Sequence, residues 1–562
     1  MQDTDKVDLV VVGSGAAGMA AALTAAHHGL SVIVIEKAQH WGGSSARSGG
    51  GLWIPGNSAL RSQAPADDVE AARTYLKDII GAHGNAARID AYIDRGPEVF
   101  DFLARHSPLE MRWVPGYSDY YPEAPGGRAH GRSVEPKPFD ARRLGAELAT
   151  LEPDYAAGPR NFVLTQADFR QLHLGLRNPR FLFRAIAIGA RWATGQLLRR
   201  HLLTRGQALM AMLRAGLLDA NVPLWLDTPL VALRETDGRV TGVLVRRDGV
   251  EQLIEARRGV VIAAGGFEHN AEMRQRYQRE PIGTDWTVGA KANTGDGIRA
   301  GQSIGAAVEF MADAWWGPSI PLPRVPWFCL AERNLPGSII VNERGERFMN
   351  ESLPYVEATH RMYGGEYGQG AGPGENLPAW LIFDQRYRNR YSFAGLTPRQ
   401  AIPRRWLECG AVTRADSLAE LADRIGVPAA KLEASVARFN GFAQQGKDED
   451  FGRGESAYDR YYGDPRQRPN PNLGALDSGP FYAAKMVPGD LGTKGGLVTD
   501  AVGRVLRADG SAIDGLYAAG NASAPVMGHT YAGPGATIGP ALVFAYLAVL
   551  DAAGHPAATP AL

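Results

Sequence analysis

Cysteine is scarce in this sequence, in which only Cys329 and Cys409 occur among 562 residues. Two cysteines exclude a disulfide framework and a thiolate cluster, and this low usage is typical of a reducing compartment. Neither cysteine has neighbours at metal-ligand spacing, so we expect no metal site. We expect the protein to be cytoplasmic.

Net charge is also lacking, because 60 Lys and Arg residues balance 60 Asp and Glu residues. This balance gives no reason to expect a nucleic-acid partner. The chain has no uninterrupted run of about 18 apolar residues, which argues against a membrane-spanning helix. The opening "MQDTDKVDLVVVG" carries acids where a secretory signal needs an apolar core. The length predicts two or more domains.

Glycine, in contrast, is abundant, with 68 residues. The stretch "VDLVVVGSGAAGMAAALTAAHHGLSVIVIEK" has the pattern of a buried strand, a glycine turn, a helix and a second strand. Gly13, Gly15 and Gly18 form a G-x-G-x-x-G pattern, which suits a tight turn, close approach of a pyrophosphate and helix–strand packing. Glu36 follows about 20 residues later, where a carboxylate can accept the ribose hydroxyls. Together these features predict a dinucleotide site.

A second loop of small residues distinguishes between the possible dinucleotides. "KAQHWGGSSARSGGG" follows Glu36 directly, where an NAD domain would normally continue into another helix. Small polar residues fit better against a ribityl chain and the edge of an isoalloxazine ring, so this loop favours a flavin.

Two further strand-and-turn patterns occur far along the chain, at Ala263 to Gly266 and at Gly520-Asn521. We expect both turns to lie at the sheet edge that carries Gly13. The nucleotide domain is therefore predicted to be assembled from discontinuous segments.

The glycine segments, together with "RGVVIAAGGFEHNAEM", "ANTGDGIRAG" and "GLYAAGN", resemble the flavoproteins related to fumarate reductase. Within that group, "YSDYYPEAPGG", "RFMNESLPYVE" and "GDLGTKGGLVTD…MGHTYAGPG" are similar to the motifs of 3-ketosteroid Δ1-dehydrogenases. The resemblance covers nearly the whole chain, and the tyrosine motifs are its specific part.

This resemblance implies an α/β fold, in which a Rossmann-like FAD-binding domain (1–315 and 493–562) carries an inserted α+β catalytic domain (316–492). It implies FAD-dependent 1,2-desaturation of ring A of a 3-ketosteroid in steroid catabolism. The C2 proton is removed, a hydride passes from C1 to flavin N5, and an external acceptor reoxidises the cofactor.

The resemblance also implies the catalytic residues, and their chemistry suits the reaction. The Tyr531 hydroxyl and the Gly535 amide can both donate to the ketone oxygen as an oxyanion hole. Tyr355 is the candidate base for the C2 proton, with Tyr120 as its relay. Because a free phenol has a pKa of about 10, the base must be perturbed or relayed near neutrality.

We expect FAD to be bound without a covalent link, because no histidine lies between Gly42 and Gly51. The expected cofactor-binding residues are Gly13, Ser14, Gly15, Ala16, Ala17, Gly18, Glu36, Lys37, Gly43, Ser44, Ser45, Ser48, Gly49, Gly50, Gly51, Leu230, Ala264, Gly265, Gly520, Asn521, Ala536, Thr537 and Ile538.

Two alternatives stay open: oxidation at C4–C5 of a ketosteroid, and a fumarate reductase-like reaction. The second needs arginine and histidine to hold two carboxylates. The tail loop reads "GHTYAGPG", with a tyrosine and no arginine. Arg344 and Arg347 are the nearest basic residues, and we expect them on a solvated turn.

Residues 169–218 carry nine arginines and no acid, within an insertion expected at about 160–205. Pro179 suits the first turn of a helix that places Arg180, Arg184 and Arg191 on one face. Two interpretations remain: a basic helix on the inner face of the membrane, or a hairpin packed on the FAD domain. The nine arginines are Arg170, Arg177, Arg180, Arg184, Arg191, Arg199, Arg200, Arg205 and Arg214.

Overall fold

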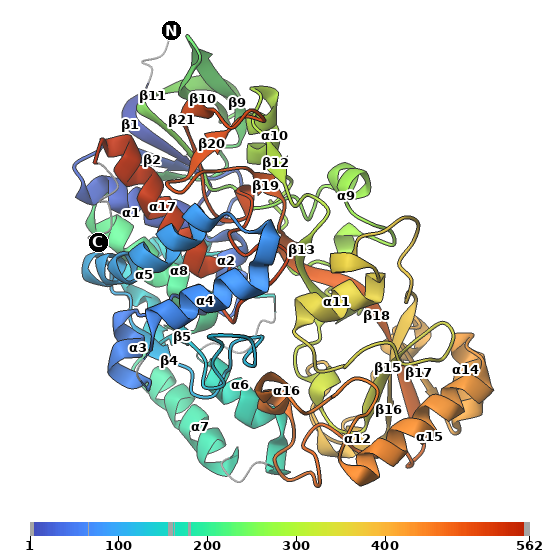
Figure 1. Ribbon diagram of the computed structural model, residues 1–562. Helices are drawn as coiled ribbons and strands as arrows, with labels where there is room; N and C mark the ends of the chain where they lie inside the picture. Colours follow the sequence, from blue (N-terminus) through green and yellow to red (C-terminus); the bar gives the residue numbers. More distant parts are fainter. Residues whose placement is uncertain (1–4, 66, 156–160, 162, 178–180, 556–562) are drawn as a thin grey trace.

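The computed structural model describes residues 5–65, 67–155, 161, 163–177 and 181–555 of the chain (Figure 1). Its larger sheet has the strand order β20-β21-β11-β1-β2-β8, and β10 and β9 continue it beside β11. The path from β21 to β8 is parallel, as the buried valine and isoleucine runs predict. The bounds are β1 (Asp5–Val12), β2 (Val32–Ile35), β8 (Leu224–Trp225), β9 (Leu230–Thr236), β10 (Arg239–Arg247), β11 (Val250–Ile262), β20 (Arg504–Leu506) and β21 (Ala512–Ala518).

Segments distant in the sequence meet in this sheet. β21, close to the C-terminus, pairs with β11, and β11 pairs with β1. Backbone bonds beyond the strands keep their ends in register: the Ala263 amide donates to the Val12 carbonyl at 2.8 Å, and the Ala519 amide to the Ile262 carbonyl at 3.0 Å. The three glycine turns therefore lie at one sheet edge, and the predicted discontinuous assembly of the fold is confirmed.

Helices cover this sheet. The alanine-rich helix α1 (Ala16–His27) is buried from Ala16 to Ala25 and packs against α17 (Ile538–Ala553) and α8 (Arg205–Asp219). The apolar run "ALVFAYLAVL" at 541–550 is thus part of a core helix. Further helices outside the inserted sheet are α2 (Gly43–Arg47), α3 (Ser58–Gln63), α4 (Val69–Ile80), α5 (Ala86–His106), α9 (Ala271–Tyr277) and α10 (Asp296–Ser303), and short strands are β3 (Leu52–Trp53), β4 (Met111–Trp113), β5 (Ser133–Pro136), β6 (Phe139–Asp140), β7 (Leu202–Leu203), β12 (Val308–Glu309) and β19 (Gly496–Leu497).

A second, antiparallel sheet lies at the right of Figure 1, with the order β14-β13-β18-β16-β15 and with β17 beside β18. It begins at Ala314 and ends at Thr493, so it is an insertion of strands and helices between the two parts of the larger sheet. We propose that these two crossings are the domain boundaries. The bounds are β13 (Ala314–Ile320), β14 (Trp327–Phe328), β15 (Ser338–Asn342), β16 (Ala379–Asp384), β17 (Val412–Ala415), β18 (Phe481–Thr493), α11 (Tyr355–Tyr363), α12 (Gln385–Arg390), α13 (Arg404–Glu408), α14 (Leu418–Ile425), α15 (Ala429–Gln445) and α16 (Ala457–Tyr462).

The arginine-rich segment folds as α6 (Gln166–His173) and α7 (Phe181–Leu197), followed by α8. Arg184 and Arg191 share one helix face, as predicted, and this face is turned toward α6. Arg184 and Arg191 both turn toward Asp168 on α6, at 3.3 and 2.6 Å, because that carboxylate is almost fully buried and needs cationic partners. Pro179 and Arg180 lie outside the described residues. Among the described helices, none is long and apolar enough to cross a membrane.

Candidate active site

A cavity of about 830 Å³ lies where the glycine turns of the larger sheet face the inserted domain. All predicted site residues except Gly18 and Ala536 line this cavity. It therefore joins residues of the expected cofactor cradle to the expected catalytic tyrosines. The lining members are Gly13, Ser14, Gly15, Ala16, Ala17, Glu36, Lys37, Gly43, Ser44, Ser45, Ser48, Gly49, Gly50, Gly51, Leu230, Ala264, Gly265, Gly520, Asn521, Thr537, Ile538, Tyr120, Tyr355, Tyr531 and Gly535.

The turn after β1 requires glycine for steric reasons. Gly13 has φ +105°, and a Cβ there would approach the Ala263 carbonyl oxygen to 2.4 Å. A Cβ on Gly18 would lie 1.9 Å from the Gly13 carbonyl oxygen, so Gly18 serves the packing of helix on strand and stands behind the cavity wall. A Cβ on Gly15 would have Ser45 Oγ, at 3.6 Å, as its nearest neighbour. The space before the N-terminus of α1 is thus open for an anionic group.

Glu36 and Lys37 directly follow β2 and line the cavity. The Glu36 carboxylate accepts bonds from the Ser14 amide at 3.0 Å and the Ser14 hydroxyl at 2.7 Å. Lys37 forms an ion pair with Asp296 and a 2.5 Å bond to the Thr294 hydroxyl. Sequence reasoning missed Asp296, although it belongs to the "ANTGDG" segment of the resemblance.

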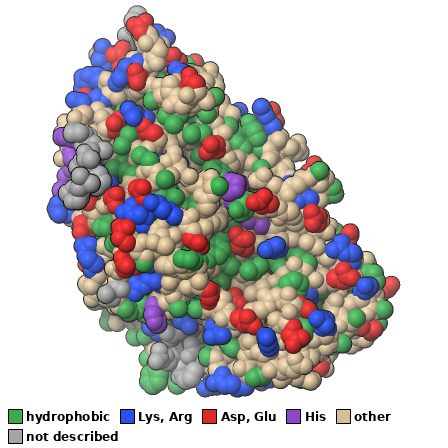
Figure 2. All heavy atoms as spheres, in the orientation of Figure 1, with side chains coloured by type: hydrophobic (Ala, Val, Ile, Leu, Met, Phe, Trp, Pro, Cys, Tyr) green, Lys and Arg blue, Asp and Glu red, His purple; other side chains and the backbone are tan. Residues whose placement is uncertain are grey.

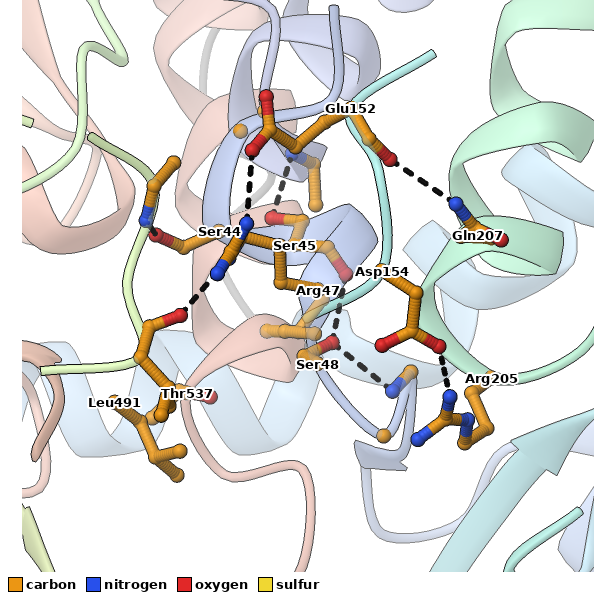
Figure 3. Close-up of a pocket in the computed structure, with 18 of the residues that line it drawn as sticks. Ser44, Ser45, Arg47, Ser48, Glu152, Asp154, Arg205, Gln207, Leu491 and Thr537 are labelled. Atoms are coloured by element: carbon orange, nitrogen blue, oxygen red, sulfur yellow. Dashed lines mark hydrogen bonds and ion pairs between the residues drawn. The ribbon is translucent and has the colours of Figure 1, made fainter. Parts of the chain in front are cut away.

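The second glycine loop forms the short helix α2, whose serines bind the backbone around the cavity (Figure 3). Ser45 Oγ accepts the Ala16 amide at 3.1 Å, and Ser44 Oγ accepts the Ala290 amide at 2.9 Å. In Figure 3, Arg47 points toward Glu152, and their ion pair measures 3.1 Å. The loop thereby connects α1 to the segment from Val288 to Asn293.

Sequence reasoning missed one wall of the cavity, which is contributed by 152–155, Asn161, 163–166, Phe169, 201–205 and Gln207. Figure 3 shows Arg205 paired with Asp154, while the Gln207 amide donates to the Glu152 carbonyl at 3.1 Å. These residues belong to no motif, so the sequence carried no signal for them.

The donor set fits FAD. Open space before α1, the Glu36 carboxylate and small residues from Gly43 to Gly51 suit the pyrophosphate, ribose and ribityl parts of that cofactor. A Cβ on Gly43 or Gly49 would meet nothing within 4 Å, which confirms that the loop leaves room.

Three tyrosines meet at the other end of the cavity. Tyr120 follows β4, Tyr355 begins α11 and Tyr531 lies in the loop before α17, and their ring centroids are 5.1 to 5.5 Å apart. The Tyr120 hydroxyl donates to the Tyr355 oxygen at 3.0 Å. The Tyr531 ring lies edge-on to the rings of Tyr120 and Tyr355, and Gly535 lines the same cavity four residues further along the loop. The structure thus brings together all four predicted catalytic groups.

Burial dominates the electrostatics of these phenols. It raises the pKa of Tyr120, Tyr355 and Tyr531, because each side chain is almost completely removed from water. The hydrogen bond from Tyr120 acts in the opposite direction on the pKa of Tyr355, since it stabilises the phenolate. A free Tyr355 phenolate is therefore scarce near neutrality, and the hydroxyl proton of Tyr355 must leave before this oxygen can accept one from a substrate.

Gly535 is held where only glycine fits. Its φ is +99°, and a Cβ would lie 2.5 Å from the Gly51 carbonyl group. The tail loop therefore packs directly on the second glycine loop, which keeps the Gly535 amide near both the cofactor cradle and the tyrosines.

Apolar side chains complete this end of the cavity. Trp315, Phe328, Leu330 and Leu491 line it beside the tyrosines. They are contributed mainly by the inserted sheet, and no sequence pattern marked them. A flat apolar wall facing a cluster of hydroxyl groups suits a fused-ring ketone.

Arg344 and Arg347, the basic residues considered for a fumarate reductase-like reaction, do not line the cavity. The Arg347 side chain is 4% exposed and is paired with Glu351 at 2.8 Å and Asp448 at 2.8 Å, so the expectation of a solvated turn is wrong for it. It is buried because the two carboxylates satisfy its guanidinium group. Arg344 is exposed, as expected.

Comparisons with known proteins agree with this site. The FAD binding domain family matches residues 8–538. The 3-oxosteroid 1-dehydrogenase of Mycolicibacterium smegmatis is 61% identical over 98% of both chains, and that of Mycobacterium tuberculosis (strain ATCC 25618 / H37Rv) is 62% identical over 97% of this chain and 98% of its own. The crystal structure of 3-ketosteroid delta1-dehydrogenase from Sterolibacterium denitrificans, in complex with 1,4-androstadiene-3,17-dione, is 41% identical with a TM-score of 0.91, covering 98% of this chain and 100% of that one. This chain belongs to the 3-ketosteroid Δ1-dehydrogenase family of FAD-binding flavoproteins.

Proposed function

We propose that this protein introduces the C1–C2 double bond into ring A of 3-ketosteroids, with FAD as its cofactor. The observation that carries this proposal is the convergence of Tyr120, Tyr355, Tyr531 and Gly535 at the apolar end of the FAD cavity. The family membership supports it, because relatives with 61% and 62% identity bear the name 3-oxosteroid 1-dehydrogenase.

The reaction begins with the ketone. The Tyr531 hydroxyl and the Gly535 amide donate to the C3 oxygen and stabilise the enolate that develops when the C2 proton leaves. The ionised Tyr355 oxygen accepts that proton and becomes a neutral phenol, and the hydrogen bond from Tyr120 stabilises the phenolate beforehand. The bound FAD supplies the hydride acceptor. An external electron acceptor, which we propose as a further partner, then reoxidises the cofactor.

A dicarboxylate substrate fits the cavity poorly. The arginines among its described lining residues are Arg47 and Arg205, and they are already paired with Glu152 and Asp154. Binding two substrate carboxylates would require breaking these pairs. The tyrosine cluster has the opposite character, with neutral hydroxyl groups beside apolar side chains.

Product analysis distinguishes the possible reactions. The protein should be incubated with a saturated 3-ketosteroid and an artificial electron acceptor, and the product examined by NMR. We expect a double bond at C1–C2. A 4-ene product alone would assign the C4–C5 reaction, and turnover of succinate without turnover of the steroid would assign the fumarate reductase-like one.

We further propose that α7 contacts the inner face of the membrane. Large exposed hydrophobic side chains gather on and just after this helix, where Phe183 is 76% exposed and Leu197 is 82% exposed. Figure 2 shows hydrophobic side chains at the lower edge of the molecule, where Figure 1 places α7. The group is Leu182, Phe183, Ile186, Trp192, Leu197 and Leu198.

The helix is inverted relative to an ordinary surface helix. Most of its large apolar residues face outward, with Ile188 as the buried exception, while Arg184 and Arg191 face Asp168 on the inner side. Its neighbour α6 lines the cavity through Gln166 and Phe169. An apolar surface one helix away from the cavity suits a substrate that partitions into lipid.

Because those arginines are paired, we expect the binding to depend mainly on apolar contacts. Flotation with anionic vesicles should persist at high salt, and Phe183→Glu and Ile186→Glu together should abolish it. Val250→Glu is the control, because Val250 is exposed on the β10–β11 hairpin of the larger sheet and does not belong to α7. If the wild-type chain does not float with any vesicle tested, the proposal is overturned. Dimers that form as the protein concentration rises would assign this face to a second copy of the chain.

A further inference from the structure

Asp313 and Lys494 stand at the two points where the chain crosses between the sheets. Asp313 directly precedes β13, and Lys494 directly follows β18. Both side chains are at most 1% exposed, and Lys494 Nζ lies 3.1 Å from Asp313 Oδ2. The two crossings are thus joined by a buried ion pair, which is a costly arrangement unless every lone pair and proton is satisfied.

Two histidines satisfy the rest of the Asp313 carboxylate. His360 Nε2 lies 3.0 Å from Oδ1, and His529 Nδ1 lies 2.9 Å from Oδ2. Lys494 also donates to the carbonyl oxygens of His529 and Thr530. Burial alone would raise the pKa of Asp313, but Lys494 and His360 hold it well below its usual range. The carboxylate is therefore ionised in the folded protein.

The positions of the two histidines connect this cluster to the active site. His360 lies on α11, five residues after Tyr355, and His529 lies two residues before Tyr531. One carboxylate thereby links the helix that begins with the candidate base to the loop that carries the ketone donor. Lys494 adds a second contact, since it lies 5.0 Å from the ring centroid of Trp315, which packs on Tyr531.

We propose that Asp313 is a positioning residue that sets the separation of the Tyr355 and Tyr531 hydroxyl groups across the two domains, through its bonds to His360 and His529. The inference rests on the proposed function. Proton removal from C2 needs the base and the ketone donor at the same time, so a small displacement of either tyrosine should slow the reaction by up to about 10²-fold.

Paired substitutions separate the hydrogen bonds from packing. His529→Asn keeps a donor near the position of Nδ1 but loses the ring, which stacks on Tyr367 at 4.4 Å. His529→Leu keeps bulk but loses the donor. We expect kcat within about threefold of wild type for His529→Asn and a loss of at least about tenfold for His529→Leu, with KM little changed. His360→Gln and His360→Leu form a second pair with the same expectation.

The readout is exchange of C2 hydrogen for solvent deuterium, normalised to FAD content. Exchange should fall in parallel with kcat in the two leucine variants. Asp448→Asn is the control, because Asp448 belongs to a buried ion pair with Arg347 and neither residue lines the cavity. It should lower the melting temperature and leave exchange unchanged. Leucine variants that exchange at the wild-type rate, or asparagine and glutamine variants as slow as leucine, would overturn the proposal. A wild-type protein that neither exchanges nor oxidises a ketosteroid would instead refute the proposed function.

Discussion

The Tyr120 hydroxyl donates to the Tyr355 oxygen at 3.0 Å, although 235 residues separate the two in the chain. The contact joins a loop of the FAD-binding part to the first residue of α11 in the inserted part. It exists only when the two parts are assembled. We infer that the base and its relay are completed by domain packing, as the Asp313 cluster is.

This contact predicts different outcomes for adjacent tyrosines. Tyr120→Phe removes the bond that stabilises the Tyr355 phenolate, which should lower kcat roughly 10- to 100-fold, the equivalent of about 1.5–3 kcal/mol for a charged hydrogen bond. Tyr121→Phe is the control, because its hydroxyl binds Glu357 at 3.0 Å. It should stay near wild type in steady-state assays. Equal losses in both variants would remove Tyr120 from the relay.

Tyr531→Phe tests the ketone donor. Loss of one oxyanion donor typically costs about 10²–10³ in rate, so kcat should fall by that factor while FAD content is unchanged. Flavin absorbance of the purified variant and its rate with a 3-ketosteroid give both quantities. A variant that loses FAD and activity in proportion would show that Tyr531 holds the fold of the loop and no more.

Glu268 predicts a pH-dependent stability. Burial raises its pKa to about 7, with Asp490 adding to the effect, while Asn293 binds one oxygen at 2.7 Å. The folded state therefore binds a proton more tightly than the unfolded state does. The stabilisation that Glu268 contributes is fully present below its unfolded pKa, which is near 4.5. It falls as the pH rises toward 7, and the free energy of unfolding decreases by at most about 1.4 kcal/mol per pH unit.

Thermal melts of Glu268→Gln against wild type between about pH 5 and 8 check the sign of this dependence. Because glutamine stays neutral, the variant should gain stability relative to wild type as pH rises. Parallel melting curves across this range would show that Glu268 is ionised throughout.

We expect FAD to be bound without a covalent bond to the protein. Acid precipitation should release all yellow colour, because no histidine lies between Gly42 and Gly51. His40 and His201 do line the cavity, so they are the residues to examine if colour stays with the pellet. Retained flavin that disappears in His40→Ala would place a covalent bond at that residue.

Local patterns predicted the parts of the fold that depend on local sequence. Gly13 and Glu36 lie on one strand–helix–strand unit, so their spacing alone indicated the cradle. The tyrosines were found only through the family resemblance, because a buried phenol has no periodic signal. The orientation of α7 was missed for a physical reason: periodicity places Arg184 and Arg191 on one face, but only the buried Asp168 decides that this face is the inner one. The Asp313 cluster depends on contacts between distant segments, which no single motif encodes.

Anaerobic mixing of the FAD-loaded protein with a 3-ketosteroid tests the proposed reaction most directly. The account predicts that flavin absorbance is bleached in a single turnover, with one equivalent of 1-ene-3-one product, and that Tyr355→Phe at equal FAD content bleaches at least about 10²-fold more slowly. Flavin that stays oxidised with the ketosteroid, or a Tyr355→Phe variant as fast as wild type, would contradict it.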